Sequence, residues 1–404
     1  MELMPILATL KRHKTAAGLI VLQVALTCTI VCNALFLISQ RIDRIQEPSG
    51  MADEELVTLR MAGLTPDENP NAQTAVDIAA LRRLPGVKGV TLVNQVPYGP
   101  QFSVSGLRRT DDEKAQGVGV PEYRAGQGGL QTLGLRLVEG RDFTPEEFRD
   151  GKAYDEQDGI NIPALVLSRV TARRLFPEGS AVGQKVWGVG SGPSVVVGVV
   201  DRMISPHPGG VDEEQLAMIL PIELNFQRGE YVLRVEAERR DAVLKSAIAA
   251  LEQAGPQRIL RSSSTWADAR SRYYAQDRSM IGLLVGVCVA LLVVTAFGIV
   301  GLASFWVQQR TRMIGTRRAL GATRGQILRY FQTENFVLSS AGIVLGMLGA
   351  AALSSVLVHQ YELPGLPWHY LPAGAVALWA LGQLAVLGPA RRAAALPPVA
   401  ALRS

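Results

Sequence analysis

Charged residues, cysteine and histidine are all scarce in this chain of 404 residues. Charged residues make up 19% of it, whereas a typical soluble domain has about 25%, and the deficit points to contact with lipid. The three cysteines are too few for a disulfide scaffold or a cysteine-rich zinc module. The four histidines are scattered, and only His207 lies in the large polar region of the chain. Because zinc needs several clustered ligands, we expect no metal site.

Motifs of hydrolases and of nucleotide-binding proteins are also absent. The sequence has no G-x-S-x-G, the nucleophile motif of α/β-hydrolases. It has no G-x-x-x-x-G-K-[ST], and the nearest string, residues 179–185, has a different spacing. We therefore expect a chain that is not an enzyme, binds no cofactor of its own and does not hydrolyse ATP.

Apolar runs are present instead. Four stretches contain no charged residue: 16–38, 280–307, 336–358 and 371–387, the last being the shortest. A membrane-spanning helix needs about 20 apolar residues, so we predict four transmembrane helices, the first within residues 1–38. Lys11, Arg12 and Lys14 precede the first run as they would in a signal peptide. That run exceeds the 7–15 apolar residues, roughly, of a signal peptide, which favours an uncleaved anchor.

The basic residues are distributed unevenly along the chain. Residues 1–38 carry a net charge of +2 and residues 308–404 a net charge of +7, so the total of +5 leaves −4 for residues 39–279. Cytoplasmic flanks of membrane helices collect Lys and Arg. We therefore place both termini and the 308–335 loop in the cytoplasm of a bacterial cell, and residues 39–279 in the periplasm.

Residues 39–279 read as a soluble α+β domain. Strand and helix patterns in residues 56–93 return in similar order in residues 231–261, which predicts one lobe from about 45–115 plus 224–263. A second lobe, about 116–223, is inserted into it. The predicted fold class is thus a polytopic α-helical membrane protein with four transmembrane helices and a large α+β periplasmic domain inserted between helices 1 and 2.

A stalk is predicted where this domain returns to the membrane. Residues 264–279 contain no helix breaker and lead directly into the second apolar run. A helix continuous from Ser264 to Gln309 would measure roughly 68 Å at 1.5 Å per residue, more than twice the hydrocarbon thickness. The alternative is a kink near Asp277.

The 308–335 loop contains more than topology requires. Basic residues at the inner face need no partner beyond lipid headgroups, but two glycines and several small or apolar residues alternate with the arginines in residues 310–324. This pattern indicates a short amphipathic helix suited to a cleft in a soluble partner. The predicted permease region, residues 280–404, ends in a cytoplasmic tail at 388–404.

Residues 310–328 resemble the cytoplasmic signature of the FtsX/MacB-like permeases of ABC transporters (type VII, the mechanotransmission class). That family's pattern runs close to R-E-I-G-I-R-R-A-L-G-A-x-R-x-x-I. Residues 389–403 are similar to the family's closing P-A-x-x-A-x-x-x-x-P-x-x-A-L-R. Residues 140–143, 172–176 and 195–200 are similar to the MacB-like periplasmic core domain.

The resemblance implies a dimer of permeases that works with two copies of an ABC ATPase subunit, on which ATP and Mg²⁺ would bind. A helix in the loop would dock on the ATPase, and the residues matching it are Arg312, Ile314, Gly315, Arg317, Arg318, Ala319, Leu320, Gly321 and Ala322. Some family members carry the ATPase on the same chain; these 404 residues contain no such domain, so a separate ATPase is expected. A periplasmic adaptor and an outer-membrane channel are further expected partners, and nucleic acid is not.

Two positions depart from the family pattern. Met313 stands where the family usually has Glu, and Thr316 where it often has Ile. We therefore expect this permease to pair with a second, more standard permease in a heterodimer. The leading interpretation is export of an antibiotic, peptide or lipid-linked molecule. The alternatives are lipoprotein release and transmembrane signalling to a periplasmic or envelope partner.

Overall fold

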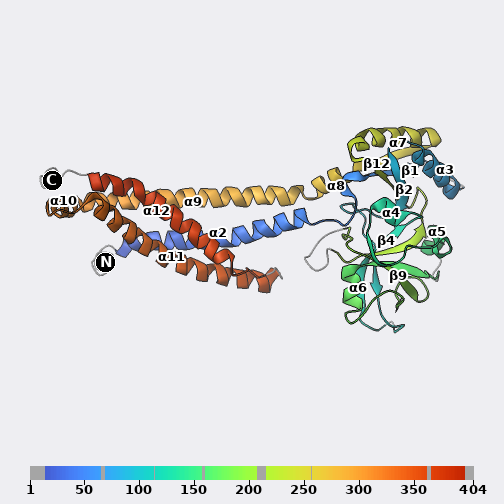
Figure 1. Ribbon diagram of the computed structural model, residues 1–404, viewed down its shortest axis with the longest axis horizontal. Coiled ribbons are helices and arrows are strands. Elements are labelled where there is room, and N and C mark those ends of the chain that lie inside the picture. Colours follow the sequence, from blue (N-terminus) through green and yellow to red (C-terminus); the bar gives the residue numbers. More distant parts are fainter. Residues whose placement is uncertain are drawn as a thin grey trace. The chain divides into compact units, whose positions relative to one another are not determined.

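The computed structural model describes residues 14–64, 69–112, 114–156, 160–206, 215–255, 257–361 and 365–395 (Figure 1). His207, the N-terminal tail before Lys14 and the tail motif after Ala395 lie outside these residues. The chain forms two compact units, the inserted domain, Glu47–Ala275, and a helical bundle made by the segments on either side of it.

The bundle contains four long helices: α2 (Lys14–Gln46), α9 (Ala275–Gln309), α11 (Arg324–Tyr361) and α12 (Tyr370–Ala395). Within the described part of the chain, these four are long and apolar enough to cross a membrane, which confirms the four predicted spans. Each helix extends beyond its charge-free run. Helix α11 begins twelve residues before Phe336, so much of the expected 308–335 loop is helical, and a short helix, α10 (Thr311–Ala319), occupies its first part.

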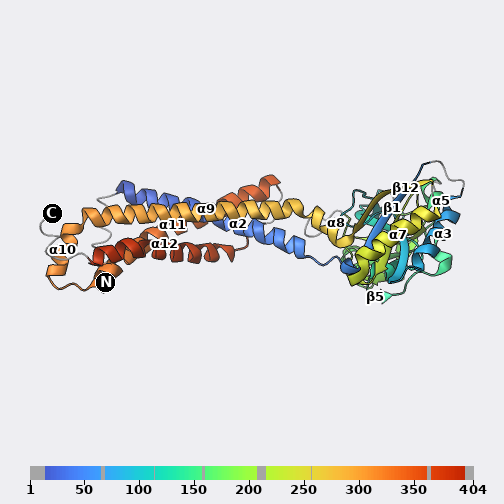
Figure 2. The same cartoon turned by 90° about the horizontal axis from the view of Figure 1, so that it is seen from above.

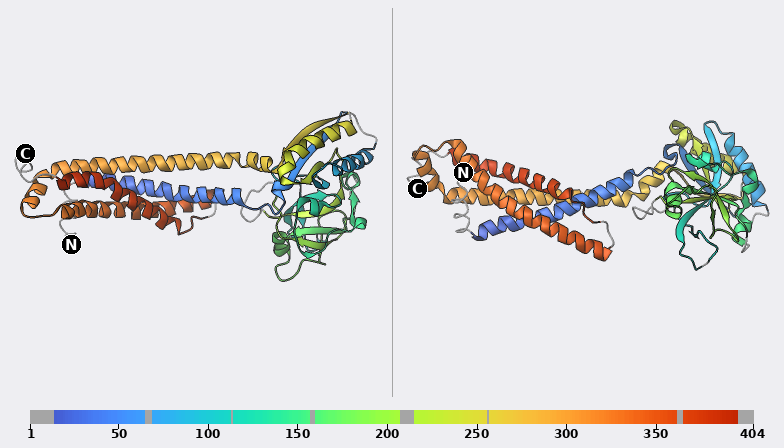
Figure 3. Two further views of the ribbon diagram at one scale, coloured as in Figure 1. Left: turned by 45° about the horizontal axis from the view of Figure 1, so that its top comes forward. Right: turned by 60° about the horizontal axis from the view of Figure 1, so that its bottom comes forward.

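Glycines bring α11 and α12 close to α2. Helix α11 crosses α2 (Figure 3). A Cβ at Gly346 would lie 2.4 Å from the Cβ of Cys28, and one at Gly374 on α12 would lie 2.4 Å from the Sγ of Cys32. No side chain fits at such distances, so the small residues permit this packing. In contrast, Gly282 on α9 has no neighbouring atom within 4 Å.

Helix α9 runs antiparallel alongside α2 (Figures 1 and 2). The hydroxyls of Thr27 and Thr295 are 2.8 Å apart, and the Gln23 amide donates to the Val294 carbonyl at 3.1 Å. Nearer the outer end, Arg41 forms an ion pair with Asp277. Polar contacts therefore fix the register of two otherwise apolar helices.

The predicted continuous stalk helix is wrong. Strand β12 (Arg258–Thr265) extends through the expected helix start because Thr265 pairs with Val57 on β1 (Leu56–Gly63). Helix α8 (Trp266–Tyr273) follows, capped by the Thr265 hydroxyl, which accepts from the Asp268 amide at 3.1 Å. The helix is then interrupted at Tyr274, and α9 begins at Ala275. The interruption lies three residues before Asp277, the alternative kink position.

The first half of the inserted domain is an antiparallel sheet in the order β12-β1-β11-β2. It contains β11 (Glu230–Val235) and β2 (Val87–Val93) besides β1 and β12. Helices α3 (Pro70–Arg82) and α7 (Arg240–Ala254) cover one face (Figure 1). The buried pair of Asp77 on α3 and Arg258 on β12, with two hydrogen bonds of 2.5 and 2.9 Å, ties helix to sheet.

The second half continues the sheet as β4-β10-β7-β9-β5 with mixed strand directions. These strands are β4 (Val118–Ala125), β10 (Met218–Glu223), β7 (Ala164–Ser168), β9 (Ser194–Val200) and β5 (Leu137–Gly140). Smaller elements surround them: β3 (Val104–Leu107), α4 (Gly129–Leu133), β6 (Arg149–Asp150), α5 (Gly151–Glu156), α6 (Arg169–Leu175), β8 (Lys185–Val186) and the 3-10 turns η1 (Asp53–Glu55), η2 (Pro145–Glu147) and η3 (Ala237–Arg239). A mixed α+β domain between the first and second spanning helices was predicted, and this is confirmed.

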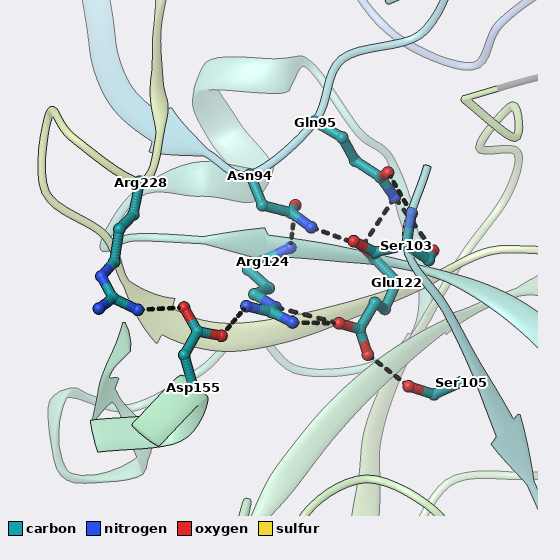
Figure 4. A network of polar contacts seen from close by, with 8 residues as sticks. All are labelled: Asn94, Gln95, Ser103, Ser105, Glu122, Arg124, Asp155 and Arg228. Carbon is teal, nitrogen blue, oxygen red and sulfur yellow. Dashed lines mark hydrogen bonds and ion pairs between the residues drawn. The ribbon is translucent and has the colours of Figure 1, made fainter. Parts of the chain in front are cut away.

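The two halves meet between β2 and β4, where the ladder contains one residue pair, Val93 and Ala125. Side-chain amides continue the pairing beyond it (Figure 4). Asn94 accepts from the Arg124 amide at 2.9 Å and donates to the Glu122 carbonyl at 3.2 Å. Gln95 donates to the same carbonyl at 2.8 Å. These contacts replace the ladder hydrogen bonds that the strands do not make.

Charged side chains extend this junction (Figure 4). The buried Glu122 carboxylate accepts from Ser105 at 2.6 Å and pairs with Arg124 at 2.7 Å. Arg124 also pairs with Asp155 on α5, which in turn pairs with Arg228 in the turn between β10 and β11, each at 2.6 Å. The guanidinium of Arg124 is thereby satisfied on both sides, which makes the chain of contacts a structural tie between the halves.

Candidate functional site

Helix α10 links α9 to α11 and contains most of the residues predicted to couple to an ATPase. Its C-terminus is a Schellman motif, in which the Ala322 amide donates to the Arg317 carbonyl at 3.0 Å and the Gly321 amide to the Arg318 carbonyl at 3.2 Å. Gly321 has φ +98°, a backbone conformation that favours glycine. The sequence thus stops the helix at a defined residue.

Helix α11 starts with a capping box at Thr323, two residues after Gly321. The Thr323 hydroxyl accepts from the Gln326 amide at 3.3 Å, and the Thr323 amide donates to the Gln326 side chain at 2.8 Å. Because both helix ends are capped, the turn from Leu320 to Thr323 has a fixed path.

The predicted site residues divide into an exposed group and a packed group. Arg312, Ala319, Leu320 and Gly321 are exposed. Leu320 is the extreme case, with 84% of its surface exposed. A single exposed leucine is ordinary on a protein surface, and the interest of Leu320 is its place in the segment that resembles the family's docking helix. We call Arg312, Ala319, Leu320 and Gly321 the exposed tip.

The remaining predicted residues hold the tip in place. Ile314 and Gly315 are buried, and Ala322 packs partly against the apolar interior of the bundle. Arg317 stacks on Tyr330 of α11, with its guanidinium carbon 5.0 Å from the ring centroid. Arg318 donates to the Ala394 carbonyl of α12 at 2.6 Å.

Two residues that the sequence reasoning missed anchor α10 at its other end. Arg310 precedes α10 and pairs with Glu334 of α11 through two hydrogen bonds of 2.8 and 2.9 Å. Arg310 is 8% exposed and Glu334 1% exposed. Trp306 lies beside the pair, 5.6 Å from the guanidinium carbon. The available signal was that Glu334 is the only acidic residue between 308 and 361, since a lone carboxylate beside an apolar run needs a cation.

This arrangement is suited to contact with another protein. It presents an apolar side chain and basic groups on a turn that is capped at both helix ends. Among the residues that the structure describes, no group of three or more His, Cys, Asp or Glu side chains is placed to hold a metal ion.

Comparison with known families identifies the chain. The model of the MacB-like periplasmic core domain matches residues 22–254, more than half of the chain, and the model of the FtsX-like permease C-terminal matches residues 285–398. The chain is an ABC transporter permease of the FtsX/MacB type. As such, this permease implies an ATPase partner. It is a membrane protein with four spans, and its inserted domain is of the periplasmic type.

One relative of the permease is itself named a permease, and others are named ATP-binding/permease proteins. The uncharacterized ABC transporter permease YknZ of Bacillus subtilis (strain 168) is 25% identical over 365 residues, 87% of this chain and 83% of YknZ. The macrolide export ATP-binding/permease protein MacB of Chromobacterium violaceum is 28% identical over 309 residues, 73% of this chain and 44% of MacB. The pyoverdine export ATP-binding/permease protein PvdT of Pseudomonas fluorescens (strain Pf0-1) is 25% identical over 414 residues, 98% of this chain and 58% of PvdT. The permease thus spans about half the length of MacB and PvdT.

A solved structure is also similar. The crystal structure of the periplasmic region of MacB from Actinobacillus actinomycetemcomitans matches with a TM-score of 0.34 and 14% sequence identity, over 57% of this chain and 97% of that one.

Proposed function

We propose that this permease couples ATP hydrolysis by a separate cytoplasmic ATPase to a conformational change of its periplasmic domain, and that this change drives export of a substrate. The observation that carries the proposal is the exposed tip, in which Leu320 is displayed on a turn capped at both helix ends. A rigid protrusion with one apolar side chain fits a pocket in a partner at low entropic cost.

The tip has a charge as well as a shape. Arg312 and Arg324, in the same segment of the chain as Leu320, are both exposed, and no acidic residue occurs between 308 and 333. We therefore expect the ATPase to offer an apolar pocket with an acidic rim, because charge complementarity steers association and fixes its orientation.

The proposed orientation puts the tip in the cytoplasm of a cell with an inner membrane, with both termini on that side. The Arg-rich side favours this placement. Beyond the far end of α11, Trp368 is 78% exposed, next to Tyr370. Such aromatic residues suit a membrane–water interface.

The tip is tested by reconstituting the permease with its ATPase in nanodiscs and measuring ATP hydrolysis. We expect Leu320→Asp to reduce the stimulation at least about tenfold, because a carboxylate replaces an apolar contact beneath an acidic rim. Arg173→Glu, a charge reversal at an exposed position on α6 of the periplasmic domain, is the control and should leave stimulation unchanged. Full stimulation by Leu320→Asp would refute the site.

We further propose that the active complex is a heterodimer with a second permease. Met313 is exposed on α10, at the position where the family pattern has Glu, so one acidic contact to the ATPase is missing on this side. A purified complex containing this permease as its only transmembrane subunit, yet showing maximal ATPase stimulation, would contradict the heterodimer.

The transported substrate is proposed to be a small organic molecule or a peptide. The names of MacB and PvdT describe export of macrolides and of pyoverdine, two chemically different cargoes. An adaptor and an outer-membrane channel would complete the path to the exterior.

A further inference from the structure

The periplasmic domain contains a cavity of about 650 Å³ between strand β2 and helix α4. Four cationic side chains line it: Arg82 from the end of α3, Lys88 from β2, Arg136 after α4, and Arg234 from β11. Among the described residues that line it, none is acidic. The cavity therefore collects positive charge in a region of the chain, residues 39–279, that has 33 acidic and 29 basic residues.

Nearby carboxylates neutralise this charge only in part. Lys88 and Arg234 share one carboxylate, that of Glu55, at 2.7 and 2.6 Å. The hydrogen bond from Lys88, followed by that from Arg234, lowers the pKa of Glu55. Each cation is thus left with donors for a second anion.

The charges of the other two lining cations, Arg136 and Arg82, are neutralised even less by neighbouring carboxylates. Arg136 shares the Asp201 carboxylate with Arg169. Arg82 forms no ion pair within the part of the chain that the structure describes. The four cations that line this cavity (Arg82, Lys88, Arg136 and Arg234) thus have two paired carboxylates, Glu55 and Asp201, and Asp201 is shared with Arg169 outside the lining.

Strand β2 and helix α4 approach each other closely at this cavity. A Cβ at Gly89 on β2 would lie 2.8 Å from the Thr132 hydroxyl on α4. Gln127 and Gln131, which also line the cavity, add neutral hydrogen-bonding groups. The mixture of several cations, amides and a hydroxyl suits a negatively charged ligand with further polar oxygens.

An adjoining cavity of about 360 Å³ shares Arg82, Val90 and Gln127 with the first. It is lined by apolar side chains that include Ile78, Leu92 and Leu224. It also contains Asp150 and Glu223, which repel an anion. A ligand occupying both cavities would place its anionic group among the cations and its apolar part in the second cavity.

We propose that this groove binds a small organic anion, a carboxylate or phosphate with an apolar portion, on the periplasmic side. The volume is that of a small-molecule site, roughly 300–1,000 Å³, which favours this occupant over a protein loop. Binding does not depend on the coupling of the tip to an ATPase, so the proposal stands apart from the function proposed above.

Calorimetry on the full chain in nanodiscs tests the groove with three probes: phenyl phosphate, inorganic phosphate and phenol. We expect phenyl phosphate to bind, inorganic phosphate to bind at least about fivefold more weakly, and phenol not to bind, because both halves of the groove contribute. Equal binding of the two phosphates, or binding of phenol alone, would overturn the proposal.

Two adjacent arginines supply a matched pair of variants. Arg82 lines both cavities, whereas Arg83, also exposed at the end of α3, lines neither. We expect Arg82→Gln to weaken phenyl phosphate binding at least about fivefold and Arg83→Gln to change it less than twofold. Equal effects of the two variants would show non-specific attraction and would refute the site. Because neither residue is buried, both variants should fold.

Discussion

The buried pair of Arg310 and Glu334 stands out among the single residues of the bundle. Two charges are removed from water here, and the desolvation cost is recovered only while both partners are present. Its position between Trp306 and the start of α10 means that the pair fixes the direction in which the short helix leaves α9.

We expect Arg310→Leu to reduce the free energy of unfolding by about 3 kcal/mol, because it strands the Glu334 carboxylate in an apolar site. Adding Glu334→Leu should restore most of that loss. Arg312→Leu, at an exposed position two residues away, is the control. Unfolding in mixed micelles by titration with SDS measures all three. A double variant no more stable than Arg310→Leu would contradict this account.

Glu230 on β11 gives the periplasmic domain a pH dependence. Burial raises the pKa of this carboxyl, and hydrogen bonding to Thr58 opposes the shift only in part. A pKa raised by folding means that the folded state binds the proton more tightly. The contribution is therefore fully present below the unfolded pKa and is lost as the pH rises through the folded pKa.

We expect Glu230→Gln to raise the thermal stability of the domain at pH 8 and to change it little at pH 4. The gain should be about 1 kcal/mol or less, since the residue is half-buried and Arg60 is near. Thermal unfolding of the full chain in detergent at the two pH values provides the measurement. An equal gain at both values would rule out ionisation of Glu230 as the cause.

At the scale of elements, the stop at Gly321 and the start at Thr323 separate α10 from α11. Without them, the helix-forming residues on both sides would run together and Leu320 would lie on a continuous helix. The start of α11 depends on the Thr323 hydroxyl, which accepts from the Gln326 amide, so the turn should be sensitive to loss of that hydroxyl.

We expect Thr323→Ala to cost about 1 kcal/mol at the start of α11, seen as about fivefold faster hydrogen exchange of the first amides of that helix. Thr316→Ala is the matched control, because the Thr316 hydroxyl donates to the Arg312 carbonyl within α10 and caps neither helix end. Exchange that changes equally in both variants would argue against the cap.

Local signals in the sequence predict some of these elements and miss others. Charge-free runs are enough to locate the spans, because each spanning helix satisfies its backbone hydrogen bonds within its own segment. The late start of α8 depends on the pairing of Thr265 with Val57, more than 200 residues away, and no periodicity within the segment reveals it.

The sequence predicts which residues form the candidate site but not which of them are exposed. The motif identifies residues 312–322 as one set, but neighbouring helices decide which of them are exposed. Arg317 and Arg318 face Tyr330 and the Ala394 carbonyl, so reversing their charge would disturb the bundle as well as any partner contact. Arg310 and Glu334 were missed because their pairing is a tertiary contact.

At the scale of the whole molecule, the chain has a soluble domain of net negative charge and a basic end of the bundle. The three cysteines are buried within the spanning helices. They should therefore not react with a membrane-impermeant maleimide. The wild-type chain can then serve as the unlabelled control for cysteine variants.

We expect Leu320→Cys to be labelled only in inverted vesicles and Arg173→Cys only in spheroplasts, because the two positions lie on opposite sides of the membrane in the proposed topology. Labelling is read as a shift on a gel. Modification of both cysteines from the same side would invalidate the topology and with it the assignment of the tip.

The doubly capped turn also bears on how such transporters diverge. Its path is set by backbone hydrogen bonds, one glycine and the capping box of Thr323 and Gln326, not by the side chain at position 320. In the docking proposed above, substitutions there would alter which ATPase is recognised while the scaffold stays intact. A gene duplicate can in this way acquire a new energy-supplying subunit by point mutation, without first passing through a misfolded ancestor.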